Sequence, residues 1–145
     1  MNRRYKWRFH FNAMHNITPE TEAGKHTHSF LVILYMEVTQ LDLEKQNTCE
    51  KALKEYLNQY NGKYLNEMEK FLGKIPTLEI ICETLYEDTK QIAAVHGMEQ
   101  VKMEVGDSPI ALFGLGKEQI ISAEAFEKYK QQLDMTYGEG QGKEK

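Results

Sequence analysis

Three histidines in the first fifth of the chain have a spacing that suits one metal ion. His26 and His28 stand two residues apart at the start of a predicted strand, so both imidazoles should leave the same face, roughly 6 to 7 Å apart. His15 ends the preceding predicted strand, and an antiparallel return would bring it beside them. Three neutral nitrogen ligands with a free fourth position are typical of catalytic zinc. We therefore predict a Zn2+ site at His15, His26 and His28; the alternative is that each is a surface or hydrogen-bonded histidine.

Two predicted strands have to position these histidines. From Tyr5 to His15, aromatic and apolar residues alternate with polar ones, which is the period of a half-buried strand, and His15 is in phase with the apolar row. The stretch Asn16 to Lys25 contains proline and glycine and reads as a loop. The segment His26 to Thr39 is apolar on both faces, so we expect helices to cover one face and an oligomer partner the other.

The rest of the chain predicts helices and two more strands. Asn47 and Glu50 resemble a capping box that opens a helix running to about Tyr60. A second helix is expected from Pro76 and Thr77 to Gly97. Strands at 101–105 and 110–115, joined by a turn at 106–109, and a short helix at about 122–133 complete the pattern. This order predicts an α+β fold with an antiparallel four-stranded sheet, two helices on one face and a short C-terminal helix.

Length, charge and composition limit the class of protein. The 145 residues fit one domain, expected over 1–136, and the polar stretch 137–145 is expected to be a disordered tail. A net charge of −4 gives no broad positive field, so we expect neither nucleic acid nor an anionic membrane as a partner. The chain has neither an apolar run of about 20 residues nor a signal peptide, which favours a cytoplasmic protein. Cys49 and Cys82, the two cysteines, each stand alone and should be packed thiols.

The histidine segments resemble a known family. Phe11 to His15 is similar to the end of the first strand in 6-pyruvoyltetrahydropterin synthase and the related bacterial 6-carboxytetrahydropterin synthase, and His26 to Phe30 resembles that family's zinc motif. Tyr64 to Asn66, Pro76 to Glu79 and Val101 to Glu104 match further pieces in the same order. The likeness spans about residues 5 to 115.

This resemblance implies a tunnelling fold, in which trimers close their sheets into a barrel and two trimers usually stack into a hexamer. It also implies that the three histidines hold zinc, that Glu104 clamps the amino and ring nitrogens of a pterin, and that Thr77 helps line the pocket. Paired carboxylate oxygens suit two parallel donors. The residues alone favour a solvent-facing Glu104, because it is out of phase with Val101 and Met103.

The sequence departs from the family pattern at two places. The family's cysteine base is missing from the loop before His26, but Glu22 and Glu20 stand at the two spacings where branches of the family place it. A glutamate there is similar to a variant group that cleaves the side chain of dihydroneopterin triphosphate to 6-hydroxymethyl-dihydropterin for folate synthesis, and a glutamate can act as a general base. Where the family carries an Asp-His proton relay, this chain has Asn61 and Gly62.

Three hypotheses follow for function. The first is a zinc-dependent lyase that breaks a carbon-carbon or carbon-oxygen bond in the side chain of a pterin substrate, with Glu20 or Glu22 as base. The second is a zinc- and pterin-binding homologue without catalysis. The third, a structural oligomer without ligand, requires the histidines to be incidental.

Overall fold

A computed structural model describes residues 3–116 and residue 131 of the chain. The strands and helices are β1 (Arg3–Asn16), β2 (Lys25–Val38), α1 (Leu43–Asn58), α2 (Leu78–Val95), β3 (Glu99–Gly106) and β4 (Phe113–Gly116). Three short 3-10 turns, η1 (Glu22–Gly24), η2 (Leu65–Glu67) and η3 (Glu69–Phe71), lie between them. Apart from residue 131, the helix and the tail that the sequence predicts after residue 121 lie outside the described residues.

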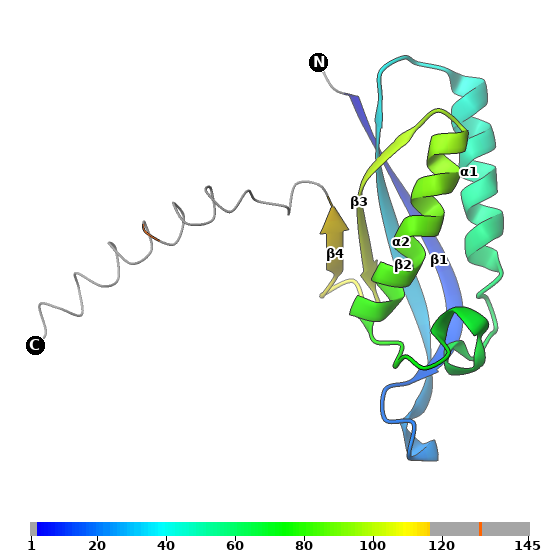
Figure 1. Ribbon diagram of the computed structural model, residues 1–145, viewed down its shortest axis with the longest axis vertical. Coiled ribbons are helices and arrows are strands. Elements are labelled where there is room, and N and C mark those ends of the chain that lie inside the picture. Colours follow the sequence, from blue (N-terminus) through cyan, green and yellow to red (C-terminus); the bar gives the residue numbers. More distant parts are fainter. Residues whose placement is uncertain (1–2, 117–130, 132–145) are drawn as a thin grey trace, which may run out of the picture.

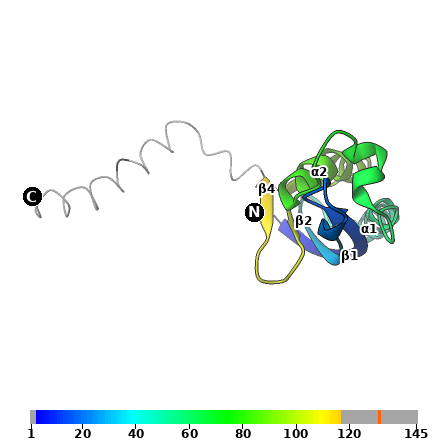
Figure 2. The same cartoon turned by 90° about the horizontal axis from the view of Figure 1, so that it is seen from below.

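The four strands form one antiparallel sheet in the order β1-β2-β3-β4. Both helices lie on the same face of this sheet (Figures 1 and 2). The α+β architecture predicted from the sequence is therefore confirmed for the described residues.

The core lies between the sheet and the two helices. Alternate residues of the strands point towards the helices, as the period of two requires. The sheet contributes the fully buried Phe30, Val32, Leu34, Met36 and Met103, and the helices contribute Leu53, Leu57, Ile81 and Leu85. Each such side chain stabilises the fold by about 1.5–3 kcal/mol through burial.

The two helices begin at capping residues. Helix α1 begins at Leu43, earlier than the predicted capping box, because the carboxylate of Asp42 accepts a hydrogen bond from the Lys45 backbone N–H at 3.1 Å. Helix α2 begins where expected, since the Thr77 hydroxyl accepts from the Ile80 N–H at 3.3 Å.

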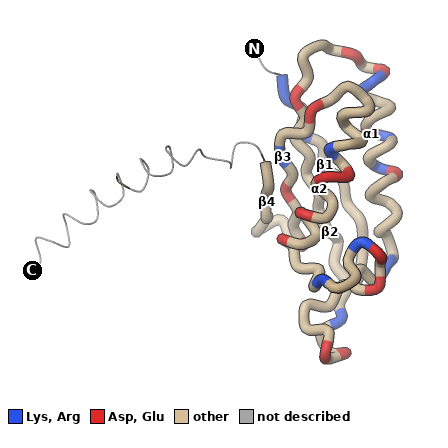
Figure 3. Tube along the Cα trace, viewed as in Figure 1, with Lys and Arg blue, Asp and Glu red and all other residues tan. Residues whose placement is uncertain are grey.

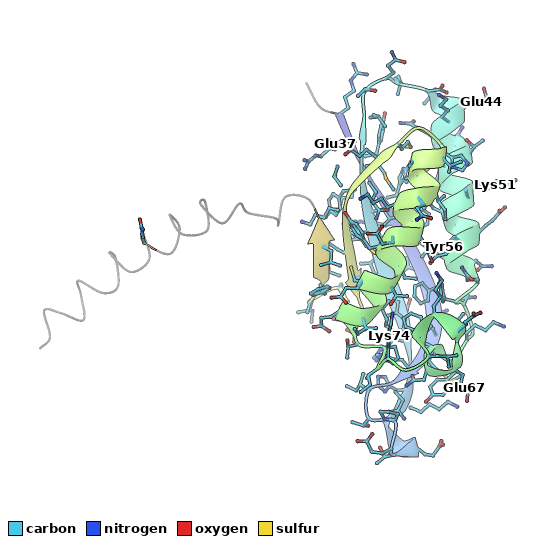
Figure 4. The ribbon with its side chains drawn as sticks, in the orientation of Figure 1. Glu37, Glu44, Lys51, Tyr56, Glu67 and Lys74 are labelled. Atoms are coloured by element: carbon cyan, nitrogen blue, oxygen red, sulfur yellow. The ribbon has the colours of Figure 1, made fainter. Side chains whose placement is uncertain are left out.

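A polar network joins the two helices to η3. The hydroxyl of Tyr56, labelled between α1 and α2 in Figure 4, donates to Asp88 at 2.6 Å, and the Lys70 ammonium lies 2.9 Å from the same carboxylate. Partial burial alone would raise the pKa of Asp88, but the hydrogen bonds from Tyr56 and Lys70 outweigh it and lower that pKa below its usual value. The ionised carboxylate therefore helps to hold the helical layer together.

The β1–β2 hairpin extends past the end of the helical layer (Figure 1). Each of its strands has 14 residues, whereas β3 has 8 and β4 has 4. The segment after α1 lies along the free edge of β1, where the Gly62 N–H donates to the Asn12 carbonyl at 2.6 Å and the Met14 N–H donates to the Lys63 carbonyl at 2.8 Å. The projecting end of the hairpin is thus fixed against the body of the domain.

The surface carries both signs of charge. Basic and acidic positions are interspersed along the trace, with acidic ones at the tip of the β1–β2 hairpin (Figure 3). Among the described residues, no helix is long and apolar enough to cross a membrane.

Candidate metal centre

The three predicted histidines meet at the projecting end of the hairpin. One ligand nitrogen from each of His15, His26 and His28 lies within 4.8 Å of the other two. Their ring centroids are 4.4 to 5.1 Å apart, and each pair of rings meets edge to face. Such spacing allows a single ion to contact all three imidazoles.

The strand register brings the histidines together. His15 on β1 is the direct cross-strand partner of His26 on β2, and His28 is the next residue of β2 on the same face. The Phe30 ring continues this row, with its centroid 5.1 Å from that of His15 and 5.7 Å from that of His28. A regular antiparallel pair with an aromatic floor is therefore enough to position all three side chains.

Hydrogen bonds to carbonyl groups orient two of the imidazoles. Nδ1 of His15 lies 2.8 Å from the Pro76 carbonyl oxygen, and Nδ1 of His26 lies 2.7 Å from that of Gly24. A carbonyl only accepts, so in both rings Nδ1 carries the proton and, in the neutral form, Nε2 keeps its lone pair. This is the arrangement by which proteins prepare histidine for a metal ion.

His15 has an unsatisfied nitrogen at the centre of the cluster. The residue is 3% exposed, and its Nε2 has no hydrogen-bond partner among the described residues. Burial lowers the pKa of His15, the Pro76 carbonyl opposes this, and the neighbouring His26 and His28 lower it further, so the neutral, ligating form is favoured. A buried unpaired acceptor costs about 1–3 kcal/mol, which a bound cation would offset. The donor set therefore fits a metal ion.

Sequence reasoning missed a carboxylate next to the cluster. Asp107 Oδ2 lies 4.0 Å from Nε2 of His28, and this side chain is 34% exposed. The signal was present in the sequence, because Asp107 continues the alternate row of Met103 and Val105, which point to the helical side of β3. Asp107 thus places a negative group beside the metal-binding nitrogens.

The structure does not bring Glu104 to the histidines within one chain. Glu104 is paired with Ile33, which puts it on the sheet face away from the helices, and it accepts a hydrogen bond from the Tyr35 hydroxyl. Burial, followed by this hydrogen bond, raises the pKa of Tyr35 to about 12.

Thr77 is adjacent to the site. It follows Pro76, whose carbonyl orients His15, but its hydroxyl already caps α2.

Glu20 and Glu22 lie in the loop between the two histidine strands. Both side chains are exposed. Glu22 begins η1, which ends at Gly24, the residue whose carbonyl orients His26. The loop that carries the two glutamates is therefore joined directly to one of the histidines.

Asn61 and Gly62, at the place of the relay pair, have structural contacts. The Asn61 side-chain oxygen accepts from the Asn12 backbone N–H at 2.8 Å. Gly62 has a φ of 76°, a left-handed conformation that favours glycine, and donates its N–H to the Asn12 carbonyl. Both residues thus fix the segment after α1 to the edge of β1.

A four-stranded antiparallel sheet with two helices on one face and three imidazoles at the end of its first hairpin defines a protein of the tunnelling-fold class. Residues 4–114 match the family of 6-pyruvoyl tetrahydropterin synthase, and the chain belongs to that family. No curated protein sequence is significantly similar to this chain.

Solved structures show the same fold at low sequence identity. The 6-pyruvoyl tetrahydropterin synthase of Caenorhabditis elegans is similar with a TM-score of 0.62 and 14% identity, over 80% of this chain and 96% of that one. An uncharacterized protein of Wolinella succinogenes is similar with a TM-score of 0.62 and 14% identity, over 81% of this chain and 99% of that one. The chain therefore has the fold of a pterin-processing enzyme family over its described length.

Proposed function

We propose that this protein is a zinc-dependent lyase that acts on the side chain of dihydroneopterin triphosphate or a closely related pterin. The observation that carries the proposal is the set of His15, His26 and His28, with a buried, unpaired Nε2 on His15, in a chain of the 6-pyruvoyl tetrahydropterin synthase family. Zinc bound to these nitrogens would polarise the side-chain oxygens of the substrate and favour loss of their protons.

Residues around the histidine cluster are proposed to bind the pterin ring. Asp107 is the carboxylate nearest to His28 among the groups described above, and we assign it to the amino and ring N–H groups of the pterin in preference to Glu104, which faces the other side of the sheet. Pro76, whose carbonyl orients His15, and the following Thr77 would form one side of the proposed pocket. This arrangement would hold the ring at one side and its side chain next to the metal ion.

Glu20 or Glu22 is the proposed base. Each lies in the loop that joins the His15 strand to the His26 strand, and Glu22 begins the turn η1 that ends at Gly24, whose carbonyl orients His26. The base would remove the proton of the 2′-hydroxyl, and the C1′–C2′ bond would break as C2′ becomes the aldehyde of a departing two-carbon fragment that keeps the triphosphate. The electron pair would pass through C1′ into the C6–N5 imine of the dihydropterin, and protonation of C1′ would leave the hydroxymethyl group.

The test is an incubation of the zinc-loaded protein with dihydroneopterin triphosphate, with the products read by mass spectrometry. We expect 6-hydroxymethyl-dihydropterin, with turnover abolished in Glu20→Gln or in Glu22→Gln while pterin affinity stays nearly unchanged. Glu44→Gln is the matched control, since this exposed glutamate lies at the far end of α1 (Figure 4). Full activity in both loop variants would show that neither glutamate is the base.

A second candidate function is a zinc- and pterin-binding protein without catalysis. It is favoured by Asn61 and Gly62, which replace the titratable relay pair and are used for backbone contacts with β1. This candidate predicts a change of pterin fluorescence on binding, lost in Asp107→Asn, with no product formed by the wild-type protein.

We also propose a homotrimer or a hexamer. Support comes from the sheet face that the helices leave open, where Leu31 and Tyr35 of β2 stay partly exposed on either side of Ile33. Native mass spectrometry should give a mass of three or six chains; a monomer at micromolar concentration contradicts the proposal.

A further inference from the structure

The side chain of Asn16 makes hydrogen bonds through both its nitrogen and its oxygen to the loop that follows it. Asn16 is 2% exposed, although it ends a strand at the projecting tip of the molecule. Its Nδ2 donates to the Thr21 carbonyl at 2.8 Å. Its Oδ1 accepts from the Thr18 backbone N–H at 2.9 Å and from the Thr18 hydroxyl at 3.3 Å. One amide thus holds both halves of the loop 17–24.

These bonds continue to His26. The Thr21 carbonyl that receives the Asn16 amide also receives the Gly24 N–H at 3.3 Å, and the Gly24 carbonyl accepts from Nδ1 of His26 at 2.7 Å. A methyl group at Gly24 would collide with the side chains of Thr18 and Asn16, so the loop closes tightly on this amide. The position of the Gly24 carbonyl, and with it the orientation of the His26 ring, depends on this closure.

The backbone of Asn16 is fixed separately. Its N–H donates to the Asn66 side-chain oxygen at 2.8 Å, and its carbonyl accepts from the Asn66 side-chain nitrogen at 2.8 Å. Asn66 lies in η2, so this reciprocal pair ties the end of β1 to the segment packed beside the hairpin. Since His15 directly precedes Asn16, the pair also restrains the strand end that carries His15.

We infer that Asn16 is a positioning residue for the metal centre, because its amide fixes the loop that orients His26 and carries Glu20 and Glu22. The inference rests on the proposed function and adds a residue outside the three candidate ligands. Groups that orient a metal-ligating histidine commonly change metal affinity by about 10- to 100-fold when they are removed.

Two substitutions of Asn16 separate its donor from its acceptor. Asn16→Ala removes both, whereas Asn16→Asp keeps an acceptor for Thr18 and loses the donor to the Thr21 carbonyl. Asn12→Ala is the matched control, because this asparagine lies on the same strand with an exposed side chain. The readout is independent of turnover: Co2+ replaces zinc, its visible spectrum reports the coordination geometry, and competition with a chelator gives its affinity.

We expect Asn16→Ala and Asn16→Asp to bind Co2+ at least 10-fold more weakly than the wild type, with an altered spectrum, while Asn12→Ala matches the wild type. With zinc, kcat should fall at least 10-fold in both variants and KM should change by less than about threefold. Folded variants with wild-type Co2+ affinity and spectrum would overturn the inference, as would variants that are both unfolded by circular dichroism, since the role of Asn16 would then be structural. A wild-type protein that binds Co2+ but converts no pterin would refute the proposed function alone.

Discussion

Replacing Asp107 with asparagine should weaken pterin binding far more than replacing Glu104 with glutamine. In the proposed complex the Asp107 carboxylate accepts two hydrogen bonds from the amino and ring N–H groups of the pterin. Asparagine keeps one acceptor, loses the charge and presents an NH2 group to a donor. A hydrogen bond to a charged group is worth about 1.5–3 kcal/mol, and the 34% exposure of this side chain favours the lower half of that range. A loss of about 2 kcal/mol corresponds to a ~30-fold higher Kd.

The assay is a fluorescence titration of the zinc-loaded protein with neopterin. Glu104→Gln should change the Kd by less than about threefold, because Glu104 is on the opposite sheet face and accepts from Tyr35. A ~30-fold loss in Glu104→Gln together with wild-type affinity in Asp107→Asn would refute the reasoning. It would mean that the clamp comes from Glu104, either through a different sheet register or from a neighbouring copy of the chain.

Three further predictions concern the scaffold of the site. The pKa of Asp88 is lower in the folded protein than in the unfolded chain, and its ionised form accepts a hydrogen bond from Tyr56. The ionised carboxylate therefore stabilises the protein at pH values above the pKa of the unfolded chain. This stabilisation is lost as the pH falls through the lower pKa of the folded protein. In urea unfolding, the free energy of unfolding should therefore fall below about pH 4, and it should fall less steeply in Asp88→Asn. At pH 7 this substitution should lower the free energy of unfolding by about 1–2 kcal/mol. Equal pH profiles of the two proteins would contradict this. Gly24→Ala should lower the free energy of unfolding by about 1–3 kcal/mol, because its methyl group collides with the closed loop; a wild-type thermal midpoint contradicts this. Burial raises the pKa of Cys49 to about 11 and that of Cys82 to about 12, so Ellman's reagent at pH 8 should react with neither thiol until guanidinium unfolds the chain; rapid reaction of the native protein would show that the thiols are accessible.

The positions of the histidines could be predicted because a strand has a simple period. His15 was in phase with an apolar row, His26 and His28 shared one face, and an antiparallel hairpin had to bring the two rows together. The cross-strand pair of His15 with His26 follows from that geometry. Metal occupancy stays a prediction, since the structure places only the nitrogens.

The carboxylate beside the site was missed because the predicted strand ended too early. The predicted strand ends at Val105, which leaves Asp107 in a turn. In the structure β3 continues to Gly106, and Asp107 follows the alternation of Met103 and Val105 towards the helical side. The alternation along β3 already puts Glu104 on the face away from the helices, where the structure has it.

Two other features depend on contacts that a sequence pattern does not contain. The early start of α1 was missed because Asp42 precedes an exposed first turn with little apolar periodicity. The Asn16 backbone is held by Asn66, which is 50 residues away in the chain. Neither local propensity nor periodicity encodes a partner at such a distance.

The most direct test of the account is the zinc content of the purified protein, measured by elemental mass spectrometry after dialysis against metal-free buffer. We expect one zinc per chain in the wild type and in His10→Ala, whose histidine is exposed on the outer sheet face. The metal should be lost in His15→Ala, His26→Ala and His28→Ala while the far-ultraviolet spectrum is kept. A wild-type protein that holds no zinc after zinc is supplied, or a folded His26→Ala variant that keeps one zinc per chain, would contradict the account.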